Sequence, residues 1–142
     1  AATGRSLGDV DIVSWVGVQM VEDGTDAIGH LKPRVAHIVA GHKTPNAVLR
    51  TVGLTQQRID EVKAVYDAKG KEGAAATISD QEVALFSLVG TAGQMRRRVL
   101  DLAAAGVTQL GLLLQQDTAV EQEAFMRVFA ARVMHPLRDG KA

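Results

Sequence analysis

The sequence contains no cysteine, so disulfide bridges, thiolate metal ligands and cysteine nucleophiles are excluded. Only 4% of its residues are aromatic, which leaves little surface on which nucleic-acid bases could stack. Neither charge sign is in excess, since 16 Lys and Arg balance 16 Asp and Glu. A protein that neutralises a phosphate backbone is expected to be basic. We therefore expect no nucleic-acid partner.

Long hydrophobic runs are also missing. No window approaches the roughly 18 uninterrupted apolar residues of a membrane-spanning helix. The first residues, AATGRSLGD, lack the basic and apolar regions of a signal peptide. These features predict a cytoplasmic protein without a membrane partner. With 46% apolar residues, the segment 1–142 is long enough to form a single domain with a hydrophobic core.

Two apolar runs predict β-strands. VDIVSWVGVQMV (10–21) is rich in β-branched residues and almost continuously apolar, and LGLLL (110–114) is a shorter run of the same kind. Runs that are apolar on both faces are typical of strands in a parallel sheet that is covered on both sides. Helical patterns separate the two strands and follow the second one. The sequence therefore predicts an α/β fold.

Apolar spacing predicts three helices between the first strand and residue 78. The first runs from Ile28 to Gly41 with a kink at Pro33. The second begins with Thr44 as N-cap and Pro45 in its first turn, and ends near Gly53. Thr55 is expected to cap the third, whose buried side is predicted to carry Ile59, Val62 and Tyr66. The segment KGKEGAAA (69–76) is predicted to be a loop.

Three capping boxes predict three further helix starts. In each, a hydroxyl residue is followed three positions later by Glu or Gln: Ser79 to Glu82, Thr91 to Gln94, and Thr118 to Glu121. The second of these helices is expected to end at Gly106 and to bury Met95, Val99 and Leu102. The last is expected to bury Phe125, Val128, Phe129 and Val133 before His135-Pro136 ends it.

The order of these blocks resembles a known family. ALFSLVGTAGQMRRRVLDLAAAGVTQLGLLL is similar to the closing portion of the luciferase-like flavin and deazaflavin oxidoreductases. The upstream blocks LKPRVAHIVAGH, VLRTVGL and AAATISDQEVALFS resemble the methylenetetrahydromethanopterin reductase branch of that family. The resemblance covers about Gly4 to Leu137, and it rests on the collinear set of blocks rather than on one motif.

This resemblance implies the C-terminal portion of a (β/α)₈ TIM barrel, with the two predicted strands as the seventh and eighth. A complete barrel needs about 250 residues. We therefore expect the remainder of the barrel to come from the same or another chain. A free segment with unpaired strand edges is expected to associate, and a homo-oligomer is predicted. Val13, Trp15, Leu112 and Leu114 are predicted to be buried against material outside the local helix pairs.

The activity that the resemblance implies is that of an oxidoreductase. A reduced flavin or deazaflavin would pass a hydride to a small substrate, or activate oxygen for it, with the deazaflavin coenzyme F-420 (F420) or FMN as cofactor. We lean to the deazaflavin because the blocks resemble the methanopterin reductase branch. No residue of this chain is assigned as catalytic, and the chain alone is expected to be inactive. The alternative is a non-catalytic α/β subunit or interaction module.

Two groups of polar residues are candidate binding residues. Active sites of barrels lie at the C-terminal ends of the strands, where Gln115 and Gln116 follow LGLLL. Together with Gln19 in the first strand they are predicted to contact the cofactor, because amides can donate to and accept from a flavin-like ring edge. The alternatives are solvated glutamines and structural bonding of Gln19. His42 and Lys43 are predicted to contact the substrate; the alternative for Lys43 is a solvated side chain. Because His30, His37, His42 and His135 share no metal-binding spacing, no metal site is expected.

Overall fold

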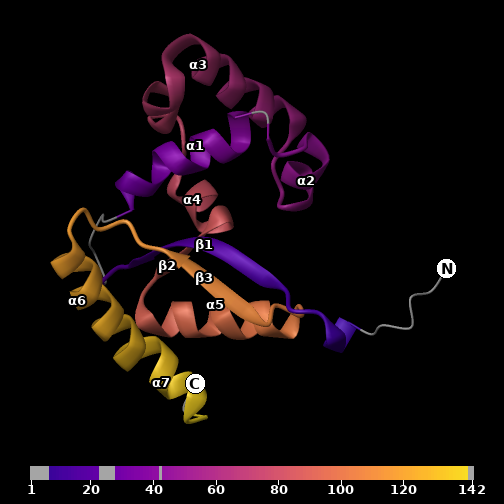
Figure 1. Cartoon of the computed structure of the whole chain (residues 1–142). Helices are drawn as coiled ribbons and strands as arrows, with labels where there is room; N and C mark the ends of the chain where they lie inside the picture. Colours follow the sequence, from indigo (N-terminus) through magenta and orange to yellow (C-terminus); the bar gives the residue numbers. More distant parts are fainter. Residues whose placement is uncertain (1–6, 23–27, 42, 141–142) are drawn as a thin grey trace.

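A computed structural model of the chain describes residues 7–22, 28–41 and 43–140. A three-stranded parallel sheet lies between helices on its two sides (Figure 1). Its strands are β1 (Val13–Met20), β2 (Ser87–Gly90) and β3 (Gln109–Leu113), and their order is β2-β1-β3. None of the helices in the described ranges combines the length and the apolar character needed to span a lipid bilayer.

The two predicted strands are direct neighbours in this sheet. β1 pairs in parallel with β3 from Val13↔Gln109 to Gly17↔Leu113, so both strands end at the same edge, as predicted. The sequence interpretation missed β2, which pairs with β1 from Gly17↔Ser87 to Met20↔Gly90. Four residues, SLVG, are too few for strand alternation to be recognised next to a helix.

A helical layer covers the sheet on the side that is uppermost in Figure 1. It consists of a 3₁₀ turn (η2, Gly29–Leu31), α1 (Lys32–Ala40), α2 (Asn46–Thr51), α3 (Gln56–Ala75) and α4 (Asp80–Phe86). Its hydrophobic core includes fully buried residues from α1 to α4: Val35, Val39, Leu49, Ile59, Val62 and Val83. Thr55 caps α3 as predicted, by accepting a hydrogen bond from the Arg58 amide.

Three predictions for this layer were wrong. Pro33 lies in the first turn of α1 rather than in its interior, and there the missing N–H costs no hydrogen bond, so it does not kink the helix. Pro45, not Thr44, occupies the N-cap of α2. The predicted loop at 69–76 is helical up to Ala75. Gly70 has a φ of +69°, which glycine adopts without strain, and the alanines after it continue as helix.

The opposite side of the sheet carries α5 (Ala92–Ala104), α6 (Ala119–Phe129), a π-helix (η3, Ala130–Met134) and α7 (His135–Arg138). A short 3₁₀ turn, η1 (Leu7–Asp9), precedes the sheet. All three predicted capping boxes are present, and Gly106 ends the α5 region with a φ of +98°. Phe129 and Val133 are buried as predicted, but Val128 is 45% exposed because it lies beside their i, i+4 row.

The two faces of the sheet have different surroundings. Val18 of β1 and Leu112 and Leu114 of the β3 segment pack into a second core with α5, Phe129 and Val133. Leu112 and Leu114 were predicted to be buried against material outside the local helix pairs, whereas here they are partly buried against the local helices. The other face is open at its N-terminal half, where Val13 is 44% and Trp15 is 67% exposed.

Candidate functional site

The candidate site lies where the C-terminal ends of β1 and β3 meet. After β1 the chain enters the α1–α4 layer, whereas after β3 it enters α6 on the other side of the sheet (Figure 1). Neighbouring parallel strands whose connections leave toward opposite faces open a crevice outside their carboxyl ends, and ligands bind there in α/β proteins. The predicted glutamines are at this crevice.

The structure brings two of the three predicted glutamines together. The side-chain amide of Gln116 donates to Gln19 Oε1 at 3.5 Å, and Gln19 Nε2 donates to the Met20 carbonyl at 3.2 Å. Gln115 instead folds back on its own strand, where its Nε2 donates to the Leu113 and Leu114 carbonyls at 2.9 and 3.2 Å. Gln19 and Gln116 thus bridge β1 and the end of β3, and their role in cofactor binding stays a prediction.

Three buried side-chain polar atoms, at or beside the sheet, have no hydrogen-bond partner within the described part of the chain. They are Gln116 Oε1, Ser87 Oγ and Arg34 Nε. Ser87 and Arg34 both lie close to Gly17 of β1. A Cβ atom added at Gly17 would be 3.5 Å from Ser87 Oγ and 3.7 Å from Arg34 Cδ. Buried polar atoms nearly always have a partner, so a set of an acceptor, a hydroxyl and a guanidinium N–H calls for a ligand or water.

One of these residues, Arg34, lines a cleft of about 510 Å³. α1 contributes Arg34 and His37 to its lining, α3 contributes Tyr66 and Lys71, and the end of β3 contributes Gln115. His37 Nδ1 and the Tyr66 hydroxyl are 2.6 Å apart, which ties the two helices together. This volume lies within the range of about 300–1,000 Å³ found for small-molecule sites.

The residues predicted to contact the substrate are not placed in this cleft. His42 lies outside the described residues. Lys43 is exposed in the turn between α1 and α2, at the opposite end of α1 from Arg34. Its position fits a solvated side chain, the alternative weighed for it from the sequence.

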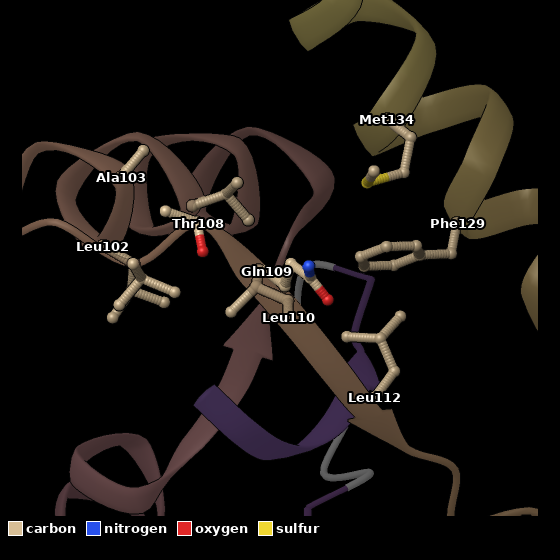
Figure 2. A pocket seen from close by; sticks show the side chains of 10 residues that line it. Leu102, Ala103, Thr108, Gln109, Leu110, Leu112, Phe129 and Met134 are labelled. Carbon is tan, nitrogen blue, oxygen red and sulfur yellow. The ribbon is translucent and has the colours of Figure 1, made fainter. Parts of the chain in front are cut away.

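A second cavity, of about 210 Å³, lies near the beginning of β3 rather than at its end. Figure 2 shows Leu102 of α5, Leu110 and Leu112 of β3, and Phe129 and Met134 of the C-terminal helices around it. Its lining is largely apolar, with Thr108 and Gln109 as the polar members. It offers no convergent set of polar groups, so we assign the site to the other end of the sheet.

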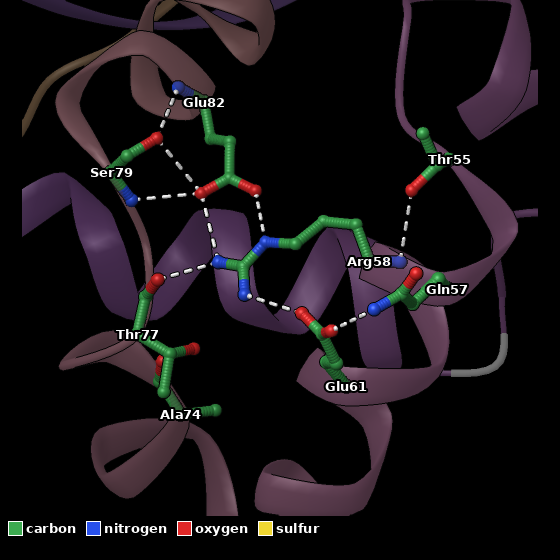
Figure 3. Close-up of polar contacts among 8 residues, drawn as sticks. All are labelled: Thr55, Gln57, Arg58, Glu61, Ala74, Thr77, Ser79 and Glu82. Carbon is green, nitrogen blue, oxygen red and sulfur yellow. Dashed lines mark hydrogen bonds and ion pairs between the residues drawn. The ribbon is translucent and has the colours of Figure 1, made fainter.

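An ion pair outside the cleft joins α3 to α4 (Figure 3). Arg58 of α3 donates to the Glu82 carboxylate of α4 through Nε at 2.7 Å and Nη2 at 3.0 Å, and to the Thr77 carbonyl at 2.5 Å. Burial raises the pKa of Glu82, but the hydrogen bonds from Arg58 and Ser79 outweigh it and leave that pKa below its ordinary value. The same contact raises the pKa of Arg58. This network holds α3, which carries Tyr66 and Lys71, against α4.

Sequence reasoning missed Arg34 and Ser87. Ser87 is the first residue of the unrecognised strand β2, so its position opposite Gly17 could not be inferred. Arg34 follows Pro33 in the first turn of α1, where an arginine carries no special pattern. Only the packing of α1 against Gly17 brings this side chain to the sheet.

A parallel sheet with helices on both sides and polar groups at its C-terminal edge defines a part of a doubly wound or barrel-type α/β protein. Comparison with known proteins specifies which. No protein-family model matches the chain. It is 31% identical over 114 residues to the 5,10-methylenetetrahydromethanopterin reductase of Archaeoglobus fulgidus, covering 78% of this chain and 34% of that protein. The reductase of the same name from Methanopyrus kandleri is 30% identical over 108 residues, covering 75% of this chain and 30% of that protein.

The solved structure of the coenzyme F420 dependent tetrahydromethanopterin reductase from Methanopyrus kandleri has the same fold. It superposes with a TM-score of 0.74 at 23% identity, over 94% of this chain and 38% of that one. The predicted resemblance to this reductase branch is confirmed, and so is the predicted fold, part of a (β/α)₈ barrel. The chain spans about a third of the length of the curated relatives it matches.

Proposed function

We propose that the chain forms the C-terminal part of the barrel of an oxidoreductase that uses the deazaflavin coenzyme F420 to transfer a hydride to or from a small substrate. The observation that carries this proposal is a set of three buried polar atoms without a partner among the described residues: Gln116 Oε1 after β3, Ser87 Oγ at the start of β2 and Arg34 Nε on α1. It is supported by the similarity to reductases, one of which is described as coenzyme F420 dependent. We prefer F420 to FMN, and hydride transfer to oxygen activation, for the same reason.

Two of these polar groups fit the edge of such a coenzyme. A deazaflavin carries neighbouring N–H and C=O groups on its pyrimidine portion, and when bound it supplies the hydride. Gln116 Oε1 would accept from a ring N–H, while the Ser87 hydroxyl can either donate or accept. The side-chain oxygen of Gln19 already accepts a hydrogen bond from Gln116 Nε2, and this contact fixes the orientation of the Gln116 side-chain amide.

The rest of the barrel would cover the open half of the sheet. Val13 and Trp15 are exposed on the face that carries Gly17 and Gln19, and β2 pairs only with the C-terminal half of β1. Burying an apolar side chain of this size is worth roughly 1.5–3 kcal/mol, which favours association with further strands. Those strands could belong to the same or another chain, and homo-oligomerisation stays a prediction.

A chimera tests the proposal. The matching third of the Archaeoglobus fulgidus reductase is replaced by this chain, and the oxidation state of F420 is followed by absorbance in the presence of the substrate of that enzyme. We expect F420-dependent turnover and a shift of Trp15 emission to shorter wavelength relative to the isolated chain, because the barrel covers the indole. Gln116→Leu should weaken F420 binding about tenfold through loss of one buried hydrogen bond.

Gln57→Leu is the matched control, since Gln57 is an exposed amide on α3 far along the chain from the strand ends. It should leave F420 binding unchanged. A chimera that melts cooperatively but neither binds nor turns over F420 would contradict the proposed function and favour a non-catalytic module. Tighter binding of FMN than of F420 would contradict the choice of coenzyme.

A further inference from the structure

The cleft between α1, α3 and the end of β3 has an uneven charge distribution. Two fixed cations, Arg34 and Lys71, line it, together with the rings of His30 and His37. The only carboxylate among its described lining residues is Glu72. Lys71 Nζ lies 3.6 Å from Glu72 Oε1, so that pair compensates itself. The charge of Arg34 has no such counterpart among the described lining residues.

Arg34 is also short of an acceptor. Its stem packs beside Gly17 of β1, where a Cβ would lie 3.7 Å from Arg34 Cδ, and its Nε is buried without a partner in the described structure. A guanidinium presents its N–H groups in a planar fork that matches the two oxygens of a carboxylate or phosphate. A buried N–H of a permanently charged group needs an acceptor, either water or a ligand, and among ligands an oxyanion also matches the charge.

Other donors surround the same space. Among the residues that the structure describes, the Tyr66 hydroxyl contacts one side-chain partner, His37 Nδ1 at 2.6 Å, and a hydroxyl offers one donor and two acceptor positions. Gln115 lines this cleft, and the next residue, Gln116, contacts Gln19 at the strand ends. A ligand seated at the strand ends could extend into this cleft.

We propose that this cleft is an oxyanion-binding site in which Arg34, assisted by Tyr66, binds a phosphate or carboxylate group of the ligand. The site rests on the charge and geometry of the cleft alone. Its assignment to the ligand of the strand ends rests on the proposed function. It also gives α1 and α3, which carry no strand-end residue, a direct part in ligand binding.

Isothermal titration of the chain with inorganic phosphate and, separately, with succinate tests the proposal without any coenzyme. We expect saturable binding of at least one anion; binding of phosphate alone identifies a phosphate-bearing ligand, and binding of succinate alone identifies a carboxylate-bearing one. Arg34→Gln should weaken this binding about tenfold or more, because hydrogen bonds to charged groups are stronger than neutral ones. Arg34→Lys, which keeps the charge but loses the fork, should fall between.

Arg50→Gln is the matched control, since Arg50 is an exposed arginine on α2 outside the cleft. It should bind the anions as the unaltered chain does. Thermal melts without anion should show cooperative unfolding for both Arg34→Gln and the unaltered chain, so that a loss of binding is not a loss of the fold. Absence of saturable binding of both anions, or equal weakening by Arg34→Gln and Arg50→Gln, overturns the proposal. The result is independent of whether the chimera turns over F420.

Discussion

Removing the Arg58 side chain should destabilise the fold more than removing one partner of an exposed ion pair. Arg58 makes two hydrogen bonds to Glu82 and one to the Thr77 carbonyl, and the two side chains of the pair are only 27% and 10% exposed. Breaking a buried pair typically costs about 3–5 kcal/mol, because the remaining charge is left uncompensated. Since Arg58 keeps some contact with water, we expect Arg58→Ala to lower the free energy of unfolding by about 2–4 kcal/mol.

Urea unfolding followed by far-ultraviolet circular dichroism measures this loss. For a domain of this size each kcal/mol lowers the melting temperature by about 2–4 °C, so the thermal midpoint should fall by roughly 5–15 °C. Arg97→Ala is the control, because Arg97 is 82% exposed and lies 3.6 Å from Asp101 on the surface of α5. Exposed pairs of this kind contribute little.

A double variant separates the two parts of the effect. Arg58→Met combined with Glu82→Leu removes both charges, and replacing a buried pair by apolar side chains is often neutral. It should therefore recover most of the stability lost in Arg58→Ala. If Arg58→Ala shifted the unfolding midpoint no more than Arg97→Ala, the network would not be what fixes α3 against α4, and the reasoning would be refuted.

Two further predictions concern acid stability and the open face of the sheet. Because the folded pKa of Glu82 lies below its ordinary value of 4.5, its stabilising contribution is present above that pH and is lost as the pH falls through the lower, folded value; Glu82→Gln should flatten this loss in urea titrations. If the loss of stability at acid pH were the same in Glu82→Gln and the unaltered chain, Glu82 would not be its cause. Gly111→Ala should displace the Trp15 ring, which a Cβ at Gly111 would overlap, and alter the fluorescence of the single tryptophan. Gly29→Ala, with open space around it, should not.

Local signals in the sequence predicted most element boundaries. The capping boxes at Ser79, Thr91 and Thr118 depend on residues three positions apart, so they can be predicted without knowledge of the tertiary structure. The two long apolar runs could also be recognised from the sequence alone, because a strand that is buried on both faces is continuously apolar. The predictions at Pro33 and at residues 69–76 were wrong because proline and glycine are compatible with more than one local structure. Proline can stand in the first turn of a helix or interrupt its interior, and glycine can lie in a loop or at a kink within a helix. The surrounding packing decides between these.

The sequence predicted only some of the residues of the candidate site. Gln19 and Gln116 could be named because both lie at or near the ends of predicted strands, and parallel strands end at one edge. Arg34 and Ser87 could not, since their proximity depends on β2 pairing with β1 and on α1 lying against Gly17. Contacts of this kind join residues far apart in the chain and leave no periodic trace.

The pairing of β1 with β3 also joins two segments that are far apart in the sequence, which favours early formation of the layer between them. The hydrogen bond from the Ile12 amide to Thr108 Oγ1 closes a loop of 96 residues, and closing a flexible loop of that length costs on the order of 4 kcal/mol. The core of the α1–α4 layer forms from residues that all lie within that loop. Once this layer is compact, it replaces a long flexible spacer by a short rigid one. The helices that wall the cleft therefore also lower the entropic barrier to joining the two strands whose ends form the crevice.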